Sequence, residues 1–79
     1  MLQKHIDMYQ QAIMEEIAGI NRIEARIEHL RNKGYTVAEY PMGSGGVGQY
    51  KQMADGSVRI QIGYGHGRYN YAYCVVLEG

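Results

Sequence analysis

The segment between Gly63 and Arg68 combines residue types that bind small anions. Glycines at positions 63, 65 and 67 alternate with Tyr64, His66 and Arg68. In an extended chain alternate side chains share one face, so this face would carry the ring, the imidazole and the guanidinium. Arginine binds phosphate or carboxylate through paired N–H groups, and tyrosine offers a plane on which a base stacks. We predict a ligand site centred on Tyr64, His66 and Arg68. The alternative is a glycine-rich hairpin connection whose polar side chains are only solvated.

Three further residues, Tyr50, Arg59 and Tyr71, are predicted as secondary members of this site. The sequence Ala54-Asp55-Gly56 indicates a hairpin turn between two strands. A three-residue loop with a left-handed Gly56 separates apolar from polar side chains better than a two-residue loop does. This loop pairs Tyr50 with Ile60 and Lys51 with Arg59. The like-charged pair is mildly unfavourable, and it concentrates positive charge on the face away from the core.

No catalytic or metal site is expected. Cys74 lies within an apolar strand, where a small core residue is the ordinary interpretation. The single cysteine and three histidines lack metal-ligand spacing. The glycine-rich loop Gly43–Gly48 is followed by a strand, whereas a phosphate-binding loop is followed by a helix. That loop is interpreted as a flexible connector or as a flap that closes over a ligand. We therefore predict no enzyme, no metal and no cofactor.

The first part of the chain is patterned as a helix. Residues 1–33 contain no proline and one glycine, and their apolar residues recur at spacings of three and four. Isoleucines at positions 6, 13, 20 and 27 occupy the same heptad position. Such a repeat keeps one stripe facing a neighbouring helix over many turns, and Lys33 and Gly34 suit a helix end. We predict one long helix over residues 1–33. The alternative is a break near Gly19 into two antiparallel pieces.

A helix of that length is expected to need a second chain. About 30 helical residues span roughly 45 Å, whereas a strand of seven or eight residues reaches only ~25 Å. The predicted partner is therefore another copy of the chain, bound through residues 2–30. Glu16 stands in the apolar stripe, either as a tolerated defect or as a polar residue that fixes the register.

Residues 35–78 change to a period of two and are predicted to form a small antiparallel sheet of three to four strands. The expected strands are residues 35–40, 47–53, 57–64 and 69–77. The last of them is apolar on both faces, which is typical of a central strand. We expect the face with Ala72, Cys74 and Val76 to lie under the helix and the tyrosine face to be covered by something else. The whole chain, residues 1–79, is taken as a single α+β domain.

Composition narrows the function classes. Eight basic and eight acidic residues give no net charge, which argues against general nucleic-acid binding. The chain shows no apolar run that spans a membrane and no signal peptide, and its lone cysteine fits a reducing compartment, so a cytoplasmic location is expected.

The expected function is non-enzymatic binding. In size and style the chain resembles the small accessory proteins of phages and mobile elements, although no family motif matches residue by residue. That resemblance implies a stoichiometric inhibitor or a protein that sequesters a nucleotide signal, and we expect an oligomer that sequesters an anionic, nucleotide-like small molecule. The alternative is an interaction module that inhibits a partner protein through a Tyr-rich surface.

Overall fold

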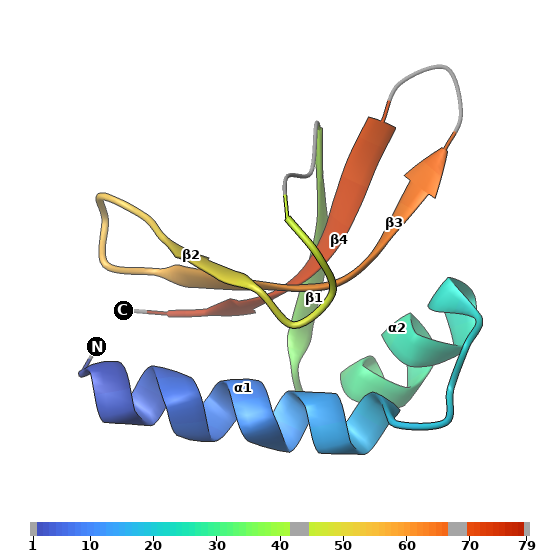
Figure 1. Ribbon diagram of the computed structural model, residues 1–79, viewed down its shortest axis with the longest axis horizontal. Helices are drawn as coiled ribbons and strands as arrows, with labels where there is room; N and C mark the ends of the chain where they lie inside the picture. Colours follow the sequence, from blue (N-terminus) through green and yellow to red (C-terminus); the bar gives the residue numbers. More distant parts are fainter. Residues whose placement is uncertain (1, 42–44, 67–69, 79) are drawn as a thin grey trace.

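The structure, a computed structural model, describes residues 2–41, 45–66 and 70–78 of the chain. Two helices precede four strands: α1 (Gln3–Ile17), α2 (Ile23–Asn32), β1 (Thr36–Pro41), β2 (Tyr50–Gln52), β3 (Val58–His66) and β4 (Asn70–Leu77). Both helices pack on one side of a single twisted antiparallel sheet (Figure 1). The α+β class predicted from the sequence is therefore confirmed.

The single helix predicted over residues 1–33 is wrong, because the chain turns at Gly19. α1 ends at Ile17, Gly19 has a φ of +82°, and α2 begins at Ile23. A left-handed φ suits glycine and is unfavourable for residues with a Cβ atom. Gly19 therefore ends the first helix, although the apolar repeat continues through it. The turn brings α2 back beneath the sheet, beside the end of α1 (Figure 1).

Arg26 holds this turn in place. Its Nε atom donates to the carbonyl oxygen of Ile20 at 2.5 Å, and its Nη1 atom donates to the carbonyl oxygen of Ile62 at 2.8 Å. One side chain thus ties α2 both to the loop between the helices and to β3. Hydrogen bonds from a charged donor are stronger than neutral ones, so this contact stabilises the folded-back arrangement.

The core lies between the helices and the sheet. Ile6, Ile13 and Ile17 of α1 and Leu30 of α2 are at most 2% exposed. They pack against buried side chains of the strands: Val37, Val58, Ile60, Ile62, Val75 and Leu77. Part of the apolar stripe predicted to need a second chain is therefore covered by the chain's own sheet. Burial of this kind is the main favourable contribution to folding.

The sheet has the strand order β1-β4-β3-β2. β4 pairs with β1 on one side and with β3 on the other, which confirms the prediction of a central last strand. The predicted consecutive hairpins β2/β3 and β3/β4 are also confirmed. β2 covers only three residues, fewer than the 47–53 predicted, because the chain before Tyr50 forms a loop.

The predicted turn after β2 is confirmed in detail. Tyr50 lies opposite Ile60 and Lys51 lies opposite Arg59. Gly56 has a φ of +91°, the left-handed conformation that the three-residue loop requires. Sorting side chains by face thus predicted the register correctly.

The faces of β4 are inverted relative to the prediction. Val75 and Leu77 lie opposite Ile60 and Val58 and share their helix-covered side, together with Tyr73. The small residues Ala72 and Cys74 therefore occupy the side without helices. The physical reason is register: the large aliphatic residues of β3 must face the helices, and their partners across the ladder face the same way.

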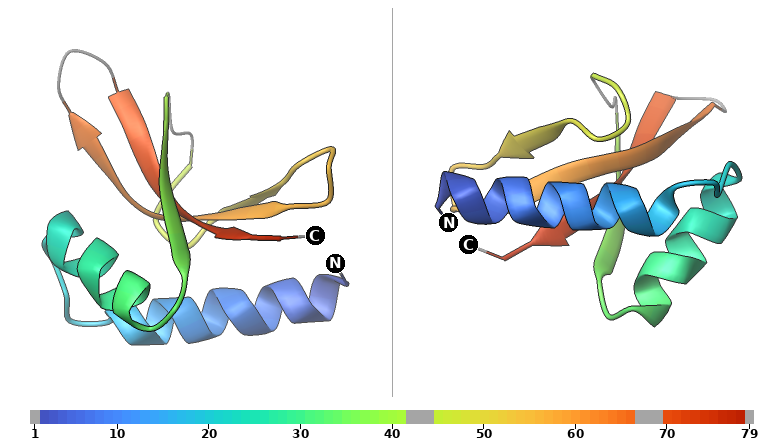
Figure 2. Two further views of the ribbon diagram at one scale, coloured as in Figure 1. Left: turned by 180° about the vertical axis from the view of Figure 1, so that it is seen from behind. Right: turned by 60° about the horizontal axis from the view of Figure 1, so that its bottom comes forward.

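Both views in Figure 2 show α1 and α2 on the same side of the sheet, so the opposite side is free of helices. We refer to that opposite side as the open face. None of the helices in the described ranges is long and apolar enough to cross a membrane.

Candidate functional site

A stacked pair, Arg59 and Tyr40, dominates the open face. The guanidinium carbon of Arg59 lies 3.5 Å from the centre of the Tyr40 ring. Tyr40 is in β1 and Arg59 in β3, so the contact passes over β4, which runs between these strands. Stacking on a ring holds an arginine flat and leaves the N–H groups at its edge available to an acceptor.

Small residues of β4 make this contact possible. Ala72 lies opposite Tyr40 in the ladder, and Cys74 lies next to it on the same face. Ala72 is 2% exposed and Cys74 is 6% exposed, although no helix covers this side. Their short side chains leave room for the tyrosine and the arginine to meet above them. The apolar character of both faces of β4 therefore has two different causes, the core on one side and this pair on the other.

The loop before β2 forms a wall beside the pair. The backbone N–H of Gly48 donates to the carbonyl of Gln61 at 2.7 Å, and the N–H of Gln61 donates to the carbonyl of Gln49 at 2.9 Å. The Gln61 side chain, which is buried, donates to the carbonyl of Gly45 at 3.1 Å. From the opposite layer, the Gln10 side chain donates to the carbonyl of Gly48. Residues 45–49 are thus fixed by three hydrogen bonds to β3 and one to α1.

These residues enclose a hollow of about 340 Å³ on the open face. Its lining is mostly polar and comes from β1, the 45–49 loop and the three other strands: Tyr40, Pro41, Gly45, Gln49, Tyr50, Lys51, Arg59, Gln61, Ala72 and Cys74. The volume falls within the range of small-molecule sites, roughly 300–1,000 Å³.

The hollow is positively charged. Lys51 and Arg59 lie directly opposite each other, and no carboxylate is among the lining residues. Within the part of the chain that the structure describes, neither cation forms an ion pair. Two adjacent like charges without a counter-ion are unfavourable for folding. An anion bound between them would remove that repulsion.

The carboxylate of Asp55, in the turn after β2, already accepts hydrogen bonds from Ser57. Hydrogen bonds from the hydroxyl and backbone N–H of Ser57 hold the pKa of Asp55 below its ordinary value, and Arg59 adds a smaller Coulombic lowering. Asp55 therefore acts as a turn residue. Burial raises the pKa of the Cys74 thiol, with an opposing contribution from Arg59. Cys74 is thus a neutral thiol at pH 7 and leaves the charge of Arg59 uncompensated.

Of the predicted site residues, Arg59 and Tyr50 line the hollow and Tyr64 lies outside it. Tyr64 pairs with Ala72 and shares the open face, but it stands further along β3 and is 52% exposed. The backbone of His66 pairs with Asn70 at the end of β3. The side chain of His66 and the whole of Arg68 lie outside the described residues. β3 therefore continues through much of the segment that we expected to form the site.

The side chains of Tyr50 and Tyr71 lie on the helix-covered side of the sheet, although Tyr50 also borders the hollow. Tyr50 packs against the core, and its hydroxyl accepts a hydrogen bond from the Gln3 side chain. Tyr71 makes an edge-to-face contact with Tyr73, with ring centres 5.4 Å apart. A Cβ atom on Gly65 would lie 2.4 Å from the Tyr71 ring. The ring of Tyr71 thus covers the bare backbone of β3 at Gly65.

Sequence reasoning missed Tyr40 and Gln61 as members of the site. The positive pair Lys51–Arg59 was visible from the turn, but the contact with Tyr40 depends on the pairing of β1 with β4. No local signal in the sequence specifies that pairing. Gln61 carried a weak signal, since it is a polar residue in a strand with buried neighbours.

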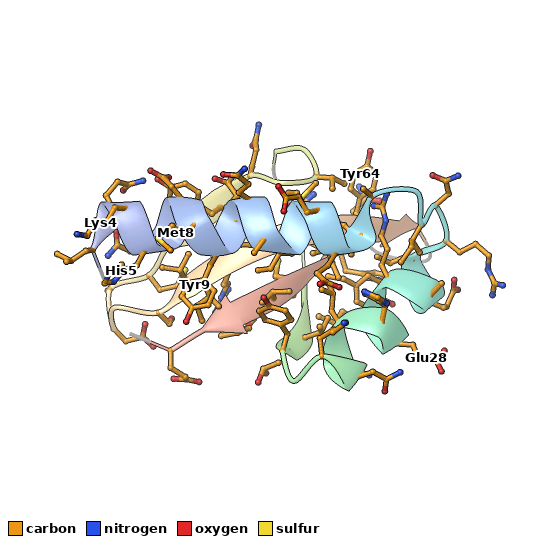
Figure 3. All side chains as sticks on the ribbon, turned by 90° about the horizontal axis from the view of Figure 1, so that it is seen from below. Lys4, His5, Met8, Tyr9, Glu28 and Tyr64 are labelled. Atoms are coloured by element: carbon orange, nitrogen blue, oxygen red, sulfur yellow. The ribbon has the colours of Figure 1, made fainter. Side chains whose placement is uncertain are left out.

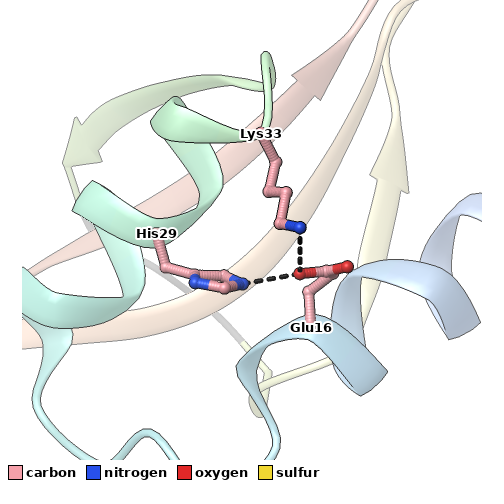
Figure 4. Close-up of polar contacts among 3 residues, drawn as sticks. All are labelled: Glu16, His29 and Lys33. Atoms are coloured by element: carbon pink, nitrogen blue, oxygen red, sulfur yellow. Dashed lines mark hydrogen bonds and ion pairs between the residues drawn. The ribbon is translucent and has the colours of Figure 1, made fainter.

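A second polar cluster joins the helices. Nε2 of His29 lies 2.5 Å from Oε2 of Glu16, and the Lys33 ammonium lies 4.0 Å from the same oxygen (Figure 4). The hydrogen bond with His29 is the main cause that lowers the pKa of Glu16. Glu16 therefore bridges α1 to α2 within one chain. No three His, Cys, Asp or Glu side chains converge as a metal site within residues 2–41, 45–66 and 70–78.

Comparison of the chain with protein-family models, with curated proteins and with solved structures found no match.

Proposed function

We propose that this protein is a non-enzymatic binding protein that captures a small anion in the hollow on its open face. The observation that carries the proposal is the Arg59 guanidinium, stacked on Tyr40 and facing Lys51, with no carboxylate in the lining. Paired cations of this kind suit a phosphate or carboxylate group, because arginine binds both oxygens at once and lysine adds a second charge.

A nucleotide-like ligand fits the remaining chemistry of the hollow. Its phosphate would meet Arg59 and Lys51, and its base would lie along the edge of the Tyr40 ring, because Arg59 covers a face of that ring. The amide groups of Gln49 and Gln61 line the same space and match the polar edge of a base. The volume suits a mononucleotide better than a polymer, which supports sequestration of a small signal molecule.

The lining also supports binding rather than catalysis. Cys74 is the thiol of the lining, and its pKa is raised. A catalytic cysteine has a lowered pKa and an adjacent base, and the lining contains no histidine, aspartate or glutamate. The buried, unpaired thiol fits a protein of the reducing cytoplasm.

Calorimetric titration of the protein with adenosine monophosphate and with inorganic phosphate tests this proposal. Arg59→Ala should weaken binding of adenosine monophosphate by roughly 10- to 100-fold, since a hydrogen bond to a charged group contributes about 1.5–3 kcal/mol. Arg59→Lys should retain part of the affinity, because it keeps the charge and loses the paired donors. Arg22→Ala, an exposed change in the loop before α2, is the matched control.

Wild-type protein that binds neither probe would refute the proposal. If the Arg59→Ala variant and the wild type bound the probe with equal affinity, the anion would bind at a site other than the Arg59 hollow. A larger loss from Tyr71→Ala than from Arg59→Ala would favour the alternative, in which a tyrosine surface contacts a partner protein.

A further inference from the structure

The outer side of α1 carries an apolar stripe that the fold leaves uncovered. We define the α1 stripe as Leu2, His5, Met8, Tyr9 and Ala12. Leu2 is 62% exposed, Met8 67% and Tyr9 44%. Figure 3, which views the molecule from below, shows Met8 on the near side of the helix and Tyr9 at its edge. Large apolar side chains gathered on one exposed face mark an interaction surface.

The stripe borders a groove of its own. His5, Met8, Tyr9, Ala12 and Tyr35 line a hollow of about 420 Å³ beside α1. This groove lies in the helical layer, whereas the Arg59 hollow lies on the opposite face of the sheet. The two surfaces are therefore independent of each other.

Charged residues beside the stripe indicate what covers it. Lys4, Met8, Gln11 and Glu15 follow one another at helical spacing, so they form a single line along α1. All four are exposed. Lys4 and Glu15 stand at opposite ends of that line, roughly 16 Å apart at 1.5 Å per residue. Within the described part of the chain, neither of them forms an ion pair.

We propose that the α1 stripe binds a second copy of this chain, with the two α1 helices antiparallel about a two-fold axis near residues 8–10. A two-fold interface needs a surface that is complementary to itself. This arrangement places Lys4 opposite Glu15 of the partner subunit, and the axis repeats the contact at the other end. Met8 then lies near Tyr9 of the partner subunit and the large His5 near the small Ala12 of the partner subunit, each offset by two residues, about 3 Å along the helix, from the level set by Lys4 and Glu15 of the partner subunit.

The charges disfavour the parallel arrangement. Parallel helices in the same register would place Lys4 beside Lys4 of the partner subunit and Glu15 beside Glu15 of the partner subunit, and like charges in contact repel. The inference narrows the predicted oligomer contact from residues 2–30 to the first four turns of α1, because Ile6, Ile13 and Ile17 are already buried in the chain's own core.

Sedimentation velocity of two charge-reversal variants over a concentration series tests the proposal. Lys4→Glu alone gives two acidic ends, and Glu15→Lys alone gives two basic ends. Each should dimerise about 10-fold more weakly than wild type, because two attractive pairs become repulsive. An equimolar mixture should form a heterodimer with about the wild-type Kd, since every charge then faces its opposite. The far-UV circular dichroism of both variants should match that of the wild type.

Glu28→Lys is the matched control, because it makes the same charge change on α2, away from the stripe (Figure 3). It should leave the Kd unchanged. A wild-type protein that is monomeric throughout the series would overturn the proposal. So would single variants that dimerise as the wild type does, or a mixture that fails to restore association. Binding of adenosine monophosphate is measured separately, so a result against the dimer does not count against the proposed Arg59 site.

Discussion

Replacing Gly19 by alanine distinguishes the two-helix arrangement from a continuous helix. The substitution should lower the free energy of unfolding in the first case and raise it in the second. Gly19 has a φ of +82°, and a Cβ atom built there meets nothing within 4 Å. The substitution therefore introduces no clash, and only the backbone conformation determines its effect. A residue with a Cβ atom in the left-handed region costs about 1–2 kcal/mol.

A continuous helix over residues 1–33 predicts the opposite. There, Gly19 would lie in a helix interior, where alanine is more favourable by about 1 kcal/mol. The two arrangements thus differ by about 2–3 kcal/mol in the free energy of unfolding. For a domain of this size 1 kcal/mol corresponds to roughly 4–8 °C in Tm. We expect Gly19→Ala, which costs about 1–2 kcal/mol, to lower the Tm by about 4–8 °C for each kcal/mol.

Thermal unfolding followed by circular dichroism, at one protein concentration, measures this difference. Gly34→Ala is the matched control, because Gly34 has a φ of +96°, has no atom within 4 Å of its Cβ position, and ends the helical region in either arrangement. Its Tm should fall as well. If Gly19→Ala raised the Tm while Gly34→Ala lowered it, the break at Gly19 would be wrong.

Three further predictions concern the wall of the hollow, the bridge between the helices and the core. Gly48→Ala should lower stability by about 1–2 kcal/mol in urea titration, since Gly48 has a φ of +91° and its Cβ would lie 3.3 Å from the Met14 sulfur; unchanged stability would argue against the described 45–49 loop. Glu16→Gln should lower the Tm at neutral pH, because the pKa of Glu16 is lowered in the fold. The contribution of Glu16 to stability is therefore complete above the ordinary pKa of 4.5, and it is lost as the pH falls from there through the lowered pKa. The Tm difference from wild type should therefore vanish in acid, and a difference that persists there would refute the bridge. Ile60→Ala, at a fully buried position, should cost about 2–5 kcal/mol in the same urea titration, and a loss below about 1 kcal/mol would show that the core is assembled differently.

Strand pairing at the β2–β3 turn was predictable from the sequence because one face must be apolar. Only the three-residue loop places Tyr50 opposite Ile60, and a shift by one residue would turn apolar side chains outward. The central position of β4 was predictable for a related reason, since a strand with one solvated face alternates apolar and polar residues and β4 does not.

The break at Gly19 was not predictable from periodicity. A heptad repeat describes which residues share a stripe, and the stripe survives when the helix folds back over its own sheet. Ile6, Ile13 and Leu30 all reach one core in the structure, from two helices rather than one. Composition alone does not decide between an intramolecular and an intermolecular partner for such a stripe.

The candidate site was predicted in part. Positive charge at Lys51 and Arg59 followed from the turn, whereas the centre at residues 64–68 rested on local alternation alone. The stacking of Arg59 on Tyr40 joins residues 19 positions apart in the sequence, across an intervening strand. Contacts of this range depend on strand order, which local patterns do not specify.

The most direct test of anion capture on the open face is a nitrogen-15 NMR titration of the wild-type protein with adenosine monophosphate. We expect the largest shifts at the amides of residues 45–52 and at the Arg59 side chain, with little change along α1. Shifts centred on residues 64–71 would contradict the assignment to the Arg59 hollow, and an unchanged spectrum at saturating probe would contradict anion binding altogether.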